Sequence, residues 1–70
     1  MNTEELRAEM GRKNISIPKL AKAVKISKKA MYSRIYGETE FKRDEITAIQ
    51  NELELSDERL IQIFFAKEVS

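Results

Sequence analysis

The 70-residue chain contains no cysteine and no histidine. The first absence excludes disulfide bonds and thiolate metal sites. Together, the two absences remove the thiol nucleophile and the commonest general base of enzymes. The only two glycines, Gly11 and Gly37, lie far apart, so no glycine-rich phosphate-binding loop exists. The carboxylates lie where helix capping explains them, and no metal-ligand spacing occurs. We therefore expect neither an enzyme nor a bound cofactor or metal.

Long apolar runs are missing as well. No stretch approaches the ~20 apolar residues that a transmembrane helix requires. Residues 1–5 are acidic and lack the apolar segment of a signal peptide. These features predict a cytoplasmic protein without a membrane partner. The length predicts one domain over residues 1–70, with a small core that is marginally stable unless the helices pack well or the chain dimerises.

Charge is distributed unevenly along the chain, although the net charge is only +1. Residues 12–43 contain ten basic and two acidic side chains, a net charge of +8, whereas residues 1–11 carry −2 and residues 44–70 carry −5. A concentrated positive segment favours a partner with dense negative charge, and nucleic acid is the commonest such partner. Ordinary solvated helix surface is the alternative explanation.

The scarcity of proline and glycine predicts an all-α fold. We expect five helices, at residues 4–13, 17–24, 28–36, 43–53 and 57–66. Ser16, Ser27 and Ser56 are typical N-caps of the second, third and fifth helices. Gly37 should end the third helix with a positive φ. Phe41, in the following loop, is expected to fill part of the core.

Residues 16–36 hold the most informative pattern, two short helices joined by a turn of a few residues. Its predicted interior consists of Ala21, Val24, Ile26, Met31 and Ile35. Five outward residues follow a spacing of i, i+1, i+4, i+5 and i+8, which places them on one helix face: Lys28, Lys29, Tyr32, Ser33 and Tyr36. This face offers donors for phosphate and guanine, a hydroxyl, and rings that can contact thymine methyls or sugars. Such a helix fits the DNA major groove.

The chain resembles the lambda repressor-like helix-turn-helix family of Cro and repressor proteins, especially short versions from phages and prophages. The resemblance covers residues 4–65. It rests on Ile15-Ser16-x-x-x-Leu20-Ala21, Val24-x-Ile26-Ser27, Met31…Ile35-Tyr36-Gly37 and Ser56-Asp57-Glu58-x-Leu60. It implies a compact five-helix DNA-binding domain with a helix-turn-helix at residues 16–36, acting in the cytoplasm of a bacterial host cell.

By this resemblance, the helix at residues 28–36 is the recognition helix. The residues implied to read bases are Lys28, Lys29, Tyr32 and Ser33. The residues implied to contact the DNA backbone lie at helix N-termini and flanks: Ser16, Lys19, Ser27, Arg34, Lys42 and Arg43. Tyr36 is expected to pack or to lie at the rim, and an ion pair with Glu38 is the alternative role of Arg34.

Three residues depart from the family pattern. Lys25 stands where the turn usually has glycine, and a left-handed lysine would cost on the order of 1 kcal/mol. Ile17 replaces a common glutamine early in the second helix, so one usual DNA contact is missing. Lys42 stands where a serine or threonine cap is expected before the fourth helix. These changes weaken particular contacts more than the fold.

The last expected helix is more apolar than a short surface helix requires. Leu60, Ile61, Phe64 and Phe65 share one face, while Ile63 points elsewhere. All of them could cap the core. We favour a homodimer, at least on DNA, because contiguous apolar patches usually mean contact. The predicted dimer surface consists of Ile61, Ile63, Phe64 and Phe65.

The sequence therefore predicts a sequence-specific DNA-binding transcriptional regulator, Cro- or repressor-like. As a dimer it would bind a pseudo-palindromic operator in double-stranded DNA, and no small-molecule ligand is evident. The alternative is a small helical protein-interaction module, an antirepressor or adaptor. That module would use the basic face or the apolar final helix without reading DNA.

Overall fold

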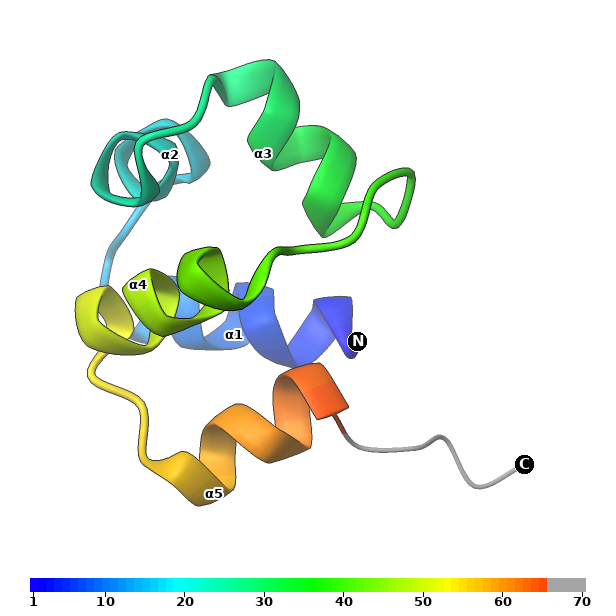
Figure 1. Ribbon diagram of the computed structural model, residues 1–70. Helices are drawn as coiled ribbons and strands as arrows, with labels where there is room; N and C mark the ends of the chain where they lie inside the picture. The colour runs from blue at the N-terminus through cyan, green and yellow to red at the C-terminus, as the bar shows by residue number, and fades with distance from the viewer. Residues whose placement is uncertain (66–70) are drawn as a thin grey trace.

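The computed structural model describes residues 1–65, and this part of the chain is entirely helical (Figure 1). A short π-helical segment, η1, directly continues the last α-helix. The elements are α1 (Thr3–Arg12), α2 (Ile17–Val24), α3 (Lys28–Ile35), α4 (Arg43–Leu53), α5 (Asp57–Leu60) and η1 (Ile61–Phe65). The predicted all-α class and five helical regions are confirmed for residues 1–65. Ala66, the last residue of the predicted fifth helix, lies outside the described residues.

Serine side chains begin three helices, as predicted. Ser16, Ser27 and Ser56 each accept a hydrogen bond from the backbone N–H three residues later, at 3.0–3.3 Å. Lys42 cannot act in this way, because an ammonium group has no acceptor. Instead, its own backbone N–H donates to Glu45 Oε1 at 2.9 Å. A carboxylate inside α4 thus replaces part of the missing cap.

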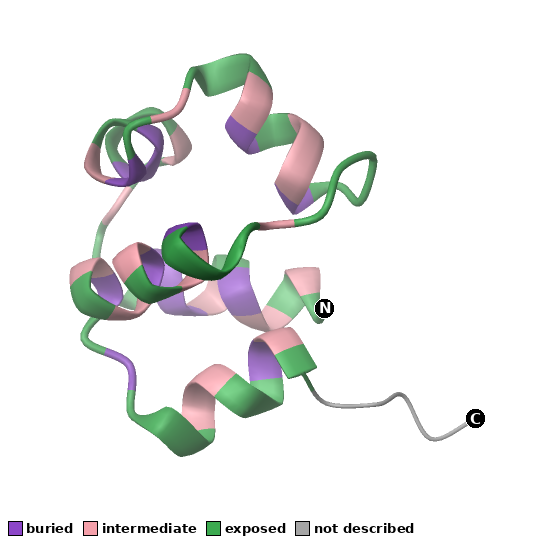
Figure 2. Cartoon of the chain, viewed as in Figure 1, coloured by how far each residue is buried: buried purple, intermediate pink, exposed green. Residues whose placement is uncertain are grey.

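The core lies between the helices, and its buried residues come from α1 to α4, from Leu55 in the turn before α5 and from η1, whereas α5 itself has no buried residue (Figure 2). Of the predicted interior of residues 16–36, four side chains are buried and Ile26 packs against them half-buried. Phe41 also packs against the core, as predicted. The buried apolar residues are Leu6, Met10, Leu20, Ala21, Val24, Met31, Ile35, Ile49, Leu53, Leu55 and Ile63.

The turn between α2 and α3 contains a left-handed lysine. Lys25 has φ 66° and ψ 40°, a conformation in which a side chain is disfavoured. We expect Lys25→Gly to raise the free energy of unfolding by about 0.5–1 kcal/mol, because relief of strain exceeds the added entropy of the unfolded chain. Urea denaturation measures this. In the control, Lys22→Gly inside α2, the free energy of unfolding should fall by about 1 kcal/mol. A loss of stability in Lys25→Gly would contradict the expectation.

An arginine with two carboxylate partners connects α5 to α1. Arg59 Nε donates to Glu9 Oε2 at 2.6 Å, and its Nη2 donates to Glu5. The backbone N–H of Asn2 also donates to the carbonyl oxygen of Ile63, at 2.7 Å. The hydrogen bond from Arg59 lowers the pKa of the buried Glu9 carboxyl below its ordinary value, despite the opposing effect of burial. The hydrogen bonds to Glu5 and Glu9 raise the pKa of the Arg59 guanidinium above its ordinary value.

We expect the protein to lose stability as the pH falls from about 5 through the lowered pKa of Glu9. A carboxyl whose pKa is lower in the folded state stabilises the fold while it is ionised, and protonation removes this contribution. The urea midpoint should therefore decrease over this range. In Glu9→Gln, which cannot ionise, the decrease should be smaller. The same pH dependence in both proteins would exclude this role for Glu9.

The final segment corrects one part of the predicted dimer surface. Ile63 is fully buried, because η1 turns its side chain into the core beside α1. Ile61 is 55% exposed and Phe65 59% exposed, whereas Phe64 is only half-buried. The predicted common face is divided: Leu60 and Phe64 pack against the core with Ile63, whereas Ile61 and Phe65 are exposed. The inclusion of Ile63 in a dimer surface was wrong.

Candidate nucleic-acid interface

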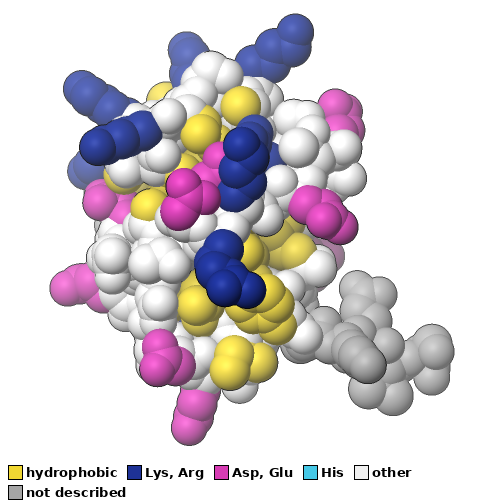
Figure 3. All heavy atoms as spheres, in the orientation of Figure 1, with side chains coloured by type: hydrophobic (Ala, Val, Ile, Leu, Met, Phe, Trp, Pro, Cys, Tyr) yellow, Lys and Arg dark blue, Asp and Glu magenta, His cyan; other side chains and the backbone are white. Residues whose placement is uncertain are grey.

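The helices α2 and α3 form one end of the molecule, and this end is rich in basic side chains. Figure 3 shows Lys and Arg side chains projecting from it, whereas Asp and Glu side chains are spread over the rest of the visible face. The charge segregation of the sequence is therefore also a segregation in space. A basic end attracts a polyanion over distances of about a Debye length.

The outward side of α3 carries the residues predicted to read bases. Lys28, Lys29 and Tyr32 are exposed, while Ser33 is half-buried. A shallow hollow of about 220 Å³ lies on this side and is lined by Lys29, Tyr32, Ser33, Tyr36 and Glu38. Four of the five predicted outward residues thus meet at one surface feature. Glu38 also lines this hollow, although the sequence predicted for it only an ion pair with Arg34.

Two tyrosines stack against each other on this surface. The rings of Tyr32 and Tyr36 are stacked, with centroids 6.2 Å apart and planes inclined by 10°. On α1, the guanidinium carbon of Arg7 lies 6.0 Å from the Tyr36 ring centroid, within cation–π range. Tyr36 is therefore held from one side by Arg7 and itself supports Tyr32. Its predicted place at the rim agrees with its 53% exposure.

The hydroxyl of Ser33 has a partner within the chain. Ser33 Oγ donates to Glu38 Oε2 at 3.3 Å, and it lies 3.2 Å from Thr39 Oγ1. The loop returns toward α3 because Gly37 has φ 87°, and the backbone N–H of Glu38 donates to the carbonyl oxygen of Ser33 at 2.9 Å. A glycine followed by glutamate at a helix end is the only sequence signal for this arrangement.

The predicted DNA-backbone contacts occupy helix starts. Ser16 and Lys19 are exposed at the start of α2, and Ser27 is exposed at the start of α3. Lys42 and Arg43 are exposed at the start of α4. Backbone N–H groups at helix N-termini can donate to phosphate oxygens. These five residues thus keep positions that suit phosphate contact.

Arg34 requires a correction. Its Nε donates to Glu45 Oε1 at 2.8 Å, and its Nη1 donates to the carbonyl oxygen of Ala30 at 3.2 Å. The side chain is 13% exposed and that of Glu45 is 8% exposed, so the pair is nearly enclosed between α3 and α4. Within residues 1–65, the predicted pair with Glu38 is absent, since the Arg34 guanidinium is directed to Glu45 and to the Ala30 carbonyl oxygen. Arg34 therefore connects two helices and is removed from the predicted phosphate contacts.

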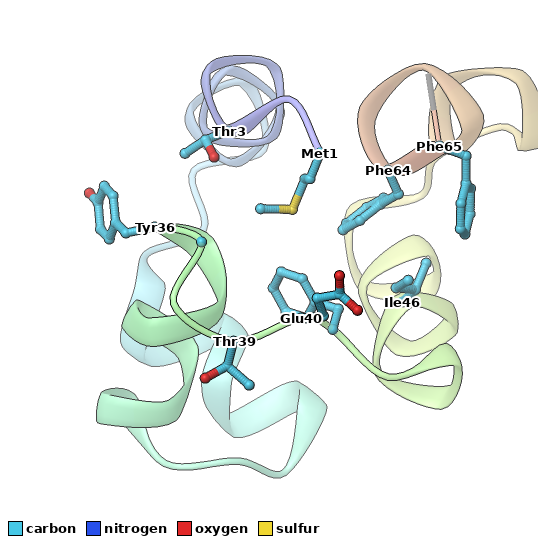
Figure 4. A pocket seen from close by; sticks show the side chains of 10 residues that line it. Met1, Thr3, Tyr36, Thr39, Glu40, Ile46, Phe64 and Phe65 are labelled. Atoms are coloured by element: carbon cyan, nitrogen blue, oxygen red, sulfur yellow. The ribbon is translucent and has the colours of Figure 1, made fainter. Parts of the chain in front are cut away.

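A second, larger hollow lies between the N-terminus, the loop before α4 and η1. It has a volume of about 470 Å³, and its lining includes Met1, Glu40, Phe41, Phe64 and Phe65. Figure 4 shows the side chains of Met1 and Phe64 projecting toward its middle, with Tyr36 at its edge. The rings of Phe41 and Phe64 meet edge to face, with centroids 5.6 Å apart. The hollow thus combines apolar side chains with polar ones, among them Thr3, Thr39 and Glu40.

Comparisons with protein-family models, with curated proteins and with solved structures find no match to this chain. The resemblance to lambda repressor-like regulators therefore stays a prediction from the residues quoted above. Over residues 1–65, every helix is too short or too polar to cross a membrane. In the same range, no three acidic side chains come together as a metal site would require.

Proposed function

We propose that this protein is a sequence-specific DNA-binding regulator of transcription, of the Cro or repressor kind, whose helix α3 enters the major groove. One observation carries the proposal: Lys28, Lys29 and Tyr32 are exposed together on the outward side of a helix at the basic end of the molecule. The major groove of B-DNA admits an α-helix. In this arrangement, α2 and α3 form a helix-turn-helix.

Each residue then has a distinct role on DNA. Lys28 and Lys29 donate to guanine O6 and N7, and Tyr32 contacts a thymine methyl or a sugar. The proposed phosphate contacts are Ser16, Lys19, Ser27, Lys42 and Arg43, which set the orientation of α3 without reading sequence. Occupying an operator against RNA polymerase would repress transcription. A phage or prophage element in a bacterial cytoplasm is the setting that the family resemblance suggests.

A homodimer on DNA belongs to the same proposal. Ile61 and Phe65 are large apolar side chains that are more than half exposed, and Phe65 also lines the hollow beside Met1 and Phe64. A second copy that covers them would remove apolar surface from water. A two-fold dimer would present its two α3 helices about 34 Å apart, one turn of DNA. The operator is then pseudo-palindromic.

The test is an equilibrium titration of the purified chain with duplex DNA from the region beside its own gene. We expect binding that survives excess random-sequence DNA and weakens steeply as salt rises, because basic residues release counterions from phosphate. A protein-interaction module would bind all duplexes equally and weakly. Equal affinity for the duplex from beside its own gene and for a scrambled duplex would therefore contradict the proposal.

A further inference from the structure

Glu38 places a negative charge on the surface that is proposed to face DNA. Its carboxylate lies 3.3 Å from the hydroxyl of Ser33 and lines the same hollow as Lys29, Tyr32 and Tyr36. The carboxylate therefore lies beside Ser33, the sixth of the eight residues of α3. If Ser33 is close to a base edge, as its predicted role requires, the Glu38 carboxylate lies one hydrogen bond away from that position.

The hydrogen bonding of this pair decides what it can offer to a ligand. The single hydroxyl proton of Ser33 is donated to Glu38, so the pair presents an acceptor to the groove. A carboxylate has about four acceptor positions, and one bond from Ser33 leaves capacity for another donor. Phosphate oxygens are acceptors and are repelled by this group. A hydrogen-bond donor on a base can instead bind to the free acceptor positions of the Glu38 carboxylate.

Only two groups in the major groove are donors, the amino groups of cytosine and adenine. The adenine amino group lies next to the N7 acceptor, which repels a carboxylate. Cytosine offers its N4 amino group without such an acceptor on the same base, and carboxylates pair with it. Its partner guanine presents O6 and N7, which suit an ammonium donor. Lys29 supplies that donor from the same hollow.

We propose that Glu38 is a specificity-determining residue that accepts a hydrogen bond from a cytosine N4 amino group, while Lys29 donates to the guanine of that C·G pair. This inference rests on the proposed function and deepens it, since it names one base pair of the operator. Ser33 is then a positioning residue that holds the carboxylate. The tight turn at Gly37 brings the carboxylate back to α3.

The experiment is selection from a random-sequence duplex DNA library by four purified proteins: wild type, Glu38→Gln, Glu38→Ala and Glu40→Gln. Glu40 is the matched control, because it is exposed and acidic but lines the other hollow. Glu40→Gln and Glu38→Gln each remove one negative charge, so both should raise sequence-independent affinity alike. Circular dichroism verifies that each variant is folded.

We expect the wild type to prefer C·G at one position of each half-site by about tenfold over other pairs. Glu38→Gln should shift that position toward A·T, since a carboxamide pairs with adenine N6 and N7. Glu38→Ala should lose the preference there, and Glu40→Gln should keep the wild-type consensus. If both Glu38 variants select the wild-type consensus, the inference is overturned and the proposed function stands. If the wild type enriches no sequence, both are overturned.

Discussion

Lys29→Ala is expected to lower the affinity for specific DNA by about ten- to a hundredfold. Lys29 is exposed on α3 and lines the hollow with Tyr32 and Ser33, so its ammonium group is available to guanine acceptors. A base-reading lysine contributes to the correct sequence more than to random DNA. The loss should therefore be several times smaller for a scrambled duplex. Tyr32→Ala should show the same selectivity.

Fluorescence anisotropy with labelled specific and scrambled duplexes, at a fixed salt concentration, measures the effect. Lys13→Ala is the matched control, because Lys13 is exposed and carries the same charge but lies at the end of α1. It should lower both affinities by the same small factor of about twofold, because a charge outside α3 adds only sequence-independent attraction to DNA. Equal losses for Lys29→Ala and Lys13→Ala would mean that α3 contributes only general charge.

Glu45→Ala is expected to lower the free energy of unfolding by about 3 kcal/mol. Removing this carboxylate leaves the guanidinium of Arg34 nearly enclosed without its charged partner, since that side chain is only 13% exposed. It also leaves the backbone N–H of Lys42 without its acceptor. A domain of this size has a free energy of unfolding of only about 4–10 kcal/mol. Glu45→Ala should therefore remove a large part of it.

Urea denaturation followed by circular dichroism measures this loss. Asp44→Ala is the control, since Asp44 is an exposed acidic neighbour in the first turn of α4 and should cost about 0.5 kcal/mol. The double variant Arg34→Met and Glu45→Leu should be more stable than Glu45→Ala, because it leaves no buried charge unpaired. A loss below 1 kcal/mol in Glu45→Ala would show that the pair contributes little.

Helix positions were predictable because their signals are local. Ser16, Ser27 and Ser56 each bond to the backbone three residues later, and Gly37 takes a positive φ beyond the end of α3. These effects need no knowledge of the rest of the fold. The outward position of Lys28 and Lys29 also follows from helical spacing alone.

Contacts between distant residues were not predictable in the same way. Sequence spacing suggested that Arg34 pairs with Glu38, four residues away, but the fold brings Glu45, eleven residues away in the first turn of α4, to the Arg34 side chain. The pairing of Arg59 with Glu9 spans fifty residues. Ile63 was misplaced for a related reason, because a face was assigned without knowing that η1 packs against α1.

The central claim is that α3 is the surface that meets DNA. Its most direct test is an NMR titration of the ¹⁵N-labelled chain with the duplex that it binds best. We predict that the largest backbone amide shifts fall on residues 27–38, with contacts between Tyr32 ring protons and protons in the major groove. Shifts concentrated instead at Ile61 and Phe65, with α3 unchanged, would contradict the account.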